Sequence, residues 1–112
     1  MILPSDFWGK SARSISVFVQ NFRQVRVGGT LGDMYYDQIT LAVQVNGGGT
    51  PSSYAWSGDV YGNQSTVIFD GPNYDLSYVT SQNSAIASCT VVINGTSYSS
   101  STVFDYSVND FN

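Results

Sequence analysis

Residues 84–96 have the sequence SAIASCTVVINGT, in which small or apolar side chains occupy every second position before an Asn-Gly pair. This period of two places the alternate residues from Ala85 to Ile93 on one face of a β-strand. Asn94-Gly95 is the strongest short signal for a two-residue hairpin, because both central positions of a type I′ turn require positive φ. The stretch therefore predicts a long strand that turns back into an antiparallel partner.

The same alternation recurs upstream between turns rich in Gly, Asn, Asp and Pro. The clearest example is Gln38–Val45, where Ile, Leu and Val alternate with Gln, Thr and Ala. Further strands are expected over 14–27 (one or two), around Tyr54 and Trp56, over 65–70 and, in a short form, over 74–80. The pattern predicts an all-β domain of about seven to nine antiparallel strands and no helix of any length.

The composition agrees with a single β-domain. The chain has 112 residues, enough to bury a core in one domain, and supplies eight Tyr, six Phe and two Trp for it. Its one cysteine, Cys89, cannot form an internal disulfide, which favours folding in a reducing compartment. The first residues lack the basic and apolar regions of a secretory signal, and no apolar run approaches the roughly 20 residues needed to cross a membrane.

The first residues differ from the rest in pattern and charge. Residues 1–13 have no β-period and are expected to form an N-terminal arm, followed by a sandwich over 14–112 whose core pattern covers about 35–108. All four cations lie within the first 26 residues, whereas seven of the eight acidic residues, all Asp, follow them. Opposite charge on arm and body favours oriented docking on a partner, although chance and solubility would also explain four cations. The predicted docking residues are Phe7, Trp8, Lys10, Arg13, Arg23 and Arg26.

The sequence argues against catalysis and against a cofactor. It has no His, so neither a Ser-His nor a Cys-His nucleophile pair can form, and zinc lacks its usual ligands. Asp59, Asp70 and Asp75 lie beside turn residues, where Asp is expected to bond to nearby backbone. No calcium-loop motif occurs, and a net charge of −4 disfavours nucleic acid. We therefore expect no catalytic residues, no metal site and no cofactor.

Tyrosine is the remaining candidate for recognition. Tyr side chains in loops suit the binding of saccharides or proteins, since each offers an apolar ring and a hydroxyl at low entropic cost. Half-burial in a small sandwich is the competing explanation for each one taken singly. The candidates in loop-like or edge positions are Tyr35, Tyr36, Tyr61, Tyr74 and Tyr78.

Residues from about 35 to 108 resemble an immunoglobulin-like (Ig-like) domain. The matching segments are 39–43 as the second strand, 54–56 as the third, 65–69 as the fifth and 87–91 as the sixth. The resemblance implies a single Ig-like β-sandwich in which Trp56 and Cys89 mark the two facing sheets. The partner cysteine is replaced by Leu41 or Val43, and Ala87 stands where such domains carry a tyrosine, which favours the looser sandwiches of bacteria and bacteriophages.

The abundance of Ser, Thr, Asn, Gly and Tyr, with almost no Lys and no Glu, is similar to that of bacteriophage virion proteins. That resemblance implies a structural, non-enzymatic component of a phage particle, made in the host cytoplasm and located in the virion. Its partners would be other capsid or tail proteins and copies of itself, without nucleic acid or membrane. The alternative is a carbohydrate- or host-surface-binding module whose loop tyrosines meet a glycan.

Overall fold

The computed structural model of the chain describes residues 12–28 and 33–110. Within these ranges the chain forms seven β-strands and no helix, and it accordingly holds no helix long and apolar enough to span a membrane. The strands are β1 (Ser14–Val27), β2 (Met34–Asn46), β3 (Ser53–Gly58), β4 (Thr66–Asp70), β5 (Tyr74–Asp75), β6 (Thr80–Ile93) and β7 (Thr96–Asn109). The predicted all-β class is confirmed.

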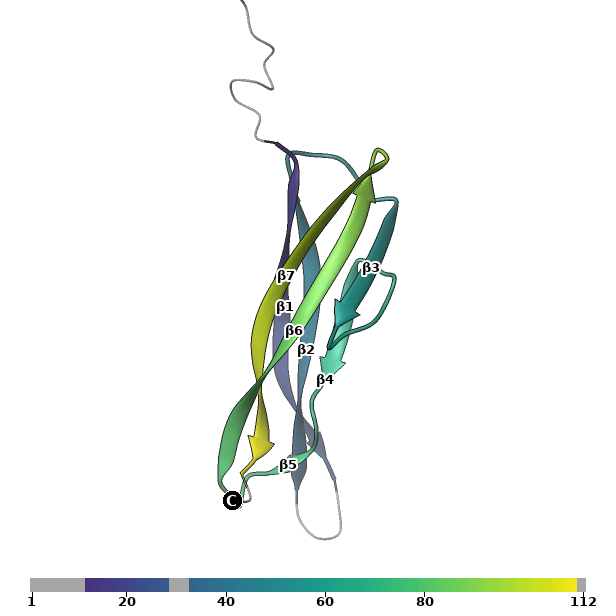
Figure 1. The fold of residues 1–112 in the computed structure, drawn as a ribbon. Coiled ribbons are helices and arrows are strands. Elements are labelled where there is room, and N and C mark those ends of the chain that lie inside the picture. Colours follow the sequence, from purple (N-terminus) through teal and green to yellow (C-terminus); the bar gives the residue numbers. More distant parts are fainter. Residues whose placement is uncertain (1–11, 29–32, 111–112) are drawn as a thin grey trace, which may run out of the picture.

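The strands form two antiparallel sheets (Figure 1). One has the order β1-β2-β4, with β5 pairing to β2 as well, and the other has the order β3-β6-β7. The edge strands β1 and β7 lie near each other, since the Val17 amide donates to the Ser100 Oγ at 3.2 Å. β3 and β4 consequently form the opposite edge of the sandwich. This is the strand order ABE and CFG of an Ig sandwich, with no D strand in residues 59–65 between β3 and β4.

Residues 14–27 form the first strand of the sandwich itself. β1 pairs with β2 along its length, from Ser14 opposite Asn46 to Val27 opposite Met34. Its side chains Ile15 and Val17 are buried in the core. The core therefore begins well before residue 35, and this segment is one strand rather than two.

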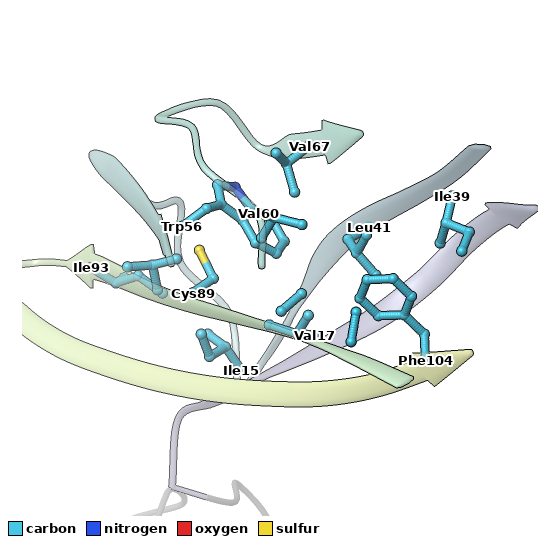
Figure 2. Close-up of a cluster of buried hydrophobic side chains, with 13 residues drawn as sticks. Ile15, Val17, Ile39, Leu41, Trp56, Val60, Val67, Cys89, Ile93 and Phe104 are labelled. Atoms are coloured by element: carbon cyan, nitrogen blue, oxygen red, sulfur yellow. The ribbon is translucent and has the colours of Figure 1, made fainter. Parts of the chain in front are cut away.

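The core lies between the two sheets, where alternate residues of each strand point inward (Figure 2). Full burial of a large apolar side chain contributes about 1.5–3 kcal/mol, so a cluster of this size dominates the stability of the domain. The buried cluster consists of Ile15, Val17, Ile39, Leu41, Trp56, Val60, Val67, Ala85, Ala87, Cys89, Val91, Ile93 and Phe104.

The expectation that Trp56 and Cys89 mark facing sheets is wrong. They lie directly opposite each other on the neighbouring strands β3 and β6 of one sheet. Directly opposite residues of an antiparallel pair share a face, so both side chains enter the core from the same side. The facing sheet contributes Leu41 and Val67 to this cluster.

Two turns show how local chemistry ends the strands. Asn94 and Gly95 have φ values of 52° and 80°, so the predicted hairpin with two positive φ angles is confirmed. The strand expected over 74–80 is wrong beyond its first two residues, because β5 ends at Asp75. There the Asp75 carboxylate accepts hydrogen bonds from the Ser77 amide and hydroxyl at 2.9 and 2.7 Å, which closes a turn.

Candidate functional site

The predicted docking residues divide into three groups. Phe7, Trp8 and Lys10 lie outside the described residues. Arg13 and Arg26 are bound within the chain, Arg13 through its Nε to the Gly48 carbonyl at 2.7 Å and Arg26 to the Asp33 carboxylate at 2.7 Å. The hydrogen bond and the charge of Asp33 raise the pKa of Arg26.

Arg23 is exposed on β1 and belongs to the most open segment of that strand. Seven consecutive residues, 18–24, are exposed, whereas Ile15 and Val17 before them are buried. The pairing register shifts between Val19 and Asn21, an irregularity that interrupts the ladder at this point. Phe22, opposite the buried Ile39, keeps 53% of its surface exposed. β1 therefore presents aromatic and cationic side chains along a sheet edge.

The five tyrosines do not gather at one site. Tyr61 is 92% exposed in the loop after β3, and Tyr78 is exposed in the loop before β6. Tyr35 and Tyr36 are half-buried neighbours on β2, so their side chains point to opposite faces of the sheet. The prediction that Tyr74 lies on a recognition surface is wrong, because only 2% of its surface is exposed.

Tyr74 is buried because it belongs to a polar network that joins four strands. Its hydroxyl donates to the Asp37 Oδ1 at 2.7 Å and accepts from the Gln24 Nε2 at 2.8 Å. The other oxygen of Asp37 accepts from the Ser107 amide at 2.7 Å, so both oxygens of this buried carboxylate have donors. Burial is the main cause that raises the pKa of Tyr74. The network connects β1, β2, β5 and β7 and thereby ties the two sheets together.

The three carboxylates near the predicted turns also have structural partners. Asp59 accepts from the Ile86 amide at 2.8 Å, and Asp70 accepts from the Gln38 side chain at 3.0 Å. The bonds from Ser77 lower the pKa of Asp75, as expected for a turn carboxylate that is held in its charged form. Among residues 12–28 and 33–110, no three Asp or Cys side chains gather as metal ligands would.

Cys89 is only 1% exposed, as predicted for a small side chain in the core. Its burial raises the pKa of the thiol. A thiol that is both inaccessible and largely protonated at neutral pH is a poor nucleophile and a poor metal ligand. The position therefore has a packing role.

A pocket of about 260 Å³ brings several of the exposed groups together. It opens at the edge of β3 that does not pair with β6, between this strand and the loop that contains Tyr61. Its lining consists of Tyr54, Ala55, Trp56, Tyr61, Gly62 and Asn63. Neither Tyr54 nor Asn63 was among the residues predicted for recognition. The spacing Tyr54-x-Trp56, followed five residues later by Tyr61, was the available signal.

The loop beside the pocket is fixed at several points. The Trp56 amide donates to the Gly62 carbonyl at 3.0 Å, and its indole Nε1 donates to the Gln64 carbonyl at 2.7 Å. The Asp59 amide donates to the Ile86 carbonyl at 2.8 Å. Gly58 starts the loop with a φ of 90°, and a Cβ there would lie 2.7 Å from the Ile86 carbonyl oxygen, so only glycine fits. The pocket is therefore formed before any ligand arrives.

Comparison with known proteins gives no relative: no family model, no curated protein and no solved structure matches this chain.

Proposed function

We propose that the chain is a structural, non-enzymatic component of a bacteriophage particle, an Ig-like decoration or an accessory protein of the tail or collar. In this proposal the sandwich docks on other virion proteins through β1 and the N-terminal residues before it. Copies of the chain repeat around the symmetric particle, so individually weak contacts add up. The composition, rich in Ser, Thr, Asn, Gly and Tyr, supports the virion setting.

The observation that carries the docking role is the open segment 18–24 of β1. Sheet edges with free backbone groups pair readily with further strands, and proteins usually protect them with charges, short strands or covering loops. This segment instead exposes Phe18 and Phe22 next to Arg23. An aromatic and cationic edge suits a protein partner that supplies a strand and carboxylates.

Immunoelectron microscopy of the source culture tests the virion setting, with an antibody raised against the purified chain. Regular labelling of particles at a fixed position is the expected result. Label confined to the soluble fraction or to cells would overturn the proposal.

The docking edge is tested with the double variant Phe22→Ser/Arg23→Asp. Fewer copies of this variant than of the wild-type chain should be bound to each particle. Ile68→Ser is the matched control, since Ile68 is an apolar residue of similar exposure, 55% against 53% for Phe22, on β4 at the opposite edge of the sandwich. Full occupancy of the double variant would show that β1 is not the docking edge.

A further inference from the structure

We infer that the pocket between β3 and the Tyr61 loop binds a single ring of a neutral sugar. The inference does not depend on docking through β1, because it concerns the opposite edge of the sandwich. β1 and β7 form one edge, and β3 and β4 form the other. A domain held by its β1 edge would present this pocket to the surroundings.

The aromatic groups of the pocket suit the apolar face of a sugar ring. Tyr54 and Tyr61 contribute aromatic side chains to its lining, and Tyr61 is 92% exposed, whereas the Trp56 ring is buried in the core. A ring this exposed is free to lie flat against the C–H groups of a pyranose, as tyrosines in binding loops do with amphipathic ligands. Trp56 holds the adjacent loop through its amide and indole nitrogen, so the wall that carries Tyr61 is already in place.

The polar groups of the pocket suit the hydroxyls of a sugar. Within residues 12–28 and 33–110, the hydroxyls of Tyr54 and Tyr61 and the amide of Asn63 form no hydrogen bond with another residue. Together they offer donors and acceptors to a ligand. Tyr74, by contrast, has its hydroxyl engaged on both sides by Gln24 and Asp37. The difference marks the pocket as a site with unused hydrogen-bonding groups.

Charge and size narrow the class of ligand. The lining contains no charged residue. A charged sugar or a phosphate would lose hydration there without gaining a counter-charge, so the ligand is neutral. Drug-sized ligands occupy pockets of about 300–1,000 Å³. The volume of about 260 Å³ is smaller, which fits one ring rather than an enclosed oligosaccharide.

The experiment is NMR titration of the full chain with the neutral methyl glycosides of glucose, galactose, mannose and N-acetylglucosamine. Saturable shifts of the amides in 54–57 and 61–64 are expected with at least one of them. Tyr61→Ala should weaken this binding roughly 3- to 10-fold, because it removes one stacking contact. Tyr78→Ala is the matched control, an exposed loop tyrosine outside the pocket, and should leave the affinity unchanged.

Two outcomes would overturn the inference. One is the absence of saturable shifts in the pocket with all four glycosides. The other is equal affinity of the wild type and Tyr61→Ala. Because Tyr61 is almost fully exposed, the Tyr61→Ala chain is expected to fold, and its amide spectrum verifies this. A proline-rich peptide and sialyllactose are titrated in parallel, and pocket shifts with either of them alone would refute the neutral-sugar class.

Discussion

The two ends of the sandwich are held together in different ways. Around Leu41, Trp56 and Cys89 the sheets meet mainly through buried apolar side chains, with a hydrogen bond from the Val17 amide to the Ser100 Oγ at the edge. Around Asp37 and Tyr74, near β5, they meet through hydrogen bonds between buried polar groups. Apolar packing scales with area and has no preferred direction, whereas hydrogen bonds fix specific partners. The apolar end therefore supplies most of the stability, and the polar end fixes how the strands are aligned.

The largest expected effect is at the apolar end. Trp56→Ala should lower the free energy of unfolding by about 3–5 kcal/mol, because it removes a buried aromatic side chain and leaves a cavity. Urea denaturation measures the loss. Val103→Ala changes an exposed apolar residue on β7 and should alter the free energy of unfolding by no more than about 0.5 kcal/mol. A loss below about 1 kcal/mol for Trp56→Ala would contradict the assignment of this end as the main source of stability.

At the polar end, Asp37→Ala should lower the free energy of unfolding by about 2–4 kcal/mol, because it leaves the Tyr74 hydroxyl and the Ser107 amide without acceptors. Hydrogen exchange should accelerate first in β5 and the end of β7, with β3 and the turn at Asn94 unchanged. Asp70→Ala, which removes an exposed carboxylate of β4, is the control and should have little effect. Uniform acceleration throughout the domain would argue that the two ends are not separate.

A smaller change at the same end is Tyr74→Phe, which keeps the ring and removes the hydroxyl. The free energy of unfolding should fall by about 1–2 kcal/mol, since Asp37 loses one of its two hydrogen-bond donors. Tyr106→Phe is the matched substitution, because Tyr106 packs on Phe69 and forms no side-chain hydrogen bond within the described residues. Equal stability of the two variants would show that the Tyr74 hydroxyl contributes nothing.

Alkaline pH should weaken the polar end selectively. Burial raises the pKa of Tyr74 in the folded state, so the folded chain holds this proton more tightly than the unfolded chain does. The stability that the protonated Tyr74 hydroxyl contributes is fully present below the ordinary tyrosine pKa of about 10. It is lost as the pH rises through the raised pKa of the folded state. Melting temperatures across this range should fall more steeply for the wild type than for Tyr74→Phe. Parallel curves would contradict the prediction.

The smallest expected effect concerns Asp75, at the exposed margin of the polar end. Hydrogen bonds from Ser77 lower its pKa, so its contribution is present above the ordinary Asp value of about 3.9 and is lost as the pH falls through the folded value. Asp75→Asn should therefore flatten the acid limb of the stability curve slightly. A steeper acid limb in the variant would reverse the sign of this assignment.

The two ends also differed in how well the sequence predicted them. The apolar end follows from local pattern, since the alternation in Gln38–Val45 and the Asn94-Gly95 turn determine which side chains face inward. The polar end joins Gln24, Asp37, Tyr74 and Ser107, which are far apart in the sequence and belong to no motif. Tyr74 stands in a turn-rich stretch, so its burial depends on an acceptor that only the folded chain brings near.

The candidate sites were predicted unevenly for the same reason. Exposure of Tyr61 follows from its place between Gly58 and Gly62 in a loop. The pocket could not be predicted in this way, because it requires Tyr54 on the edge of β3 and a loop that is hydrogen-bonded to Trp56. The sequence also did not predict that Trp56 and Cys89 lie in one sheet, since strand pairing is a long-range property that alternation alone does not specify.

The single thiol of this chain, Cys89, can report how often the apolar end opens. A thiol reagent reaches Cys89 only when the sheets part, because the side chain is 1% exposed and no other cysteine competes for the reagent. The rate of labelling under native conditions therefore reports how often the apolar end opens, without an engineered cysteine. Labelling as slow in Asp37→Ala as in the wild type would mean that the polar end can open while the rest of the sandwich stays closed.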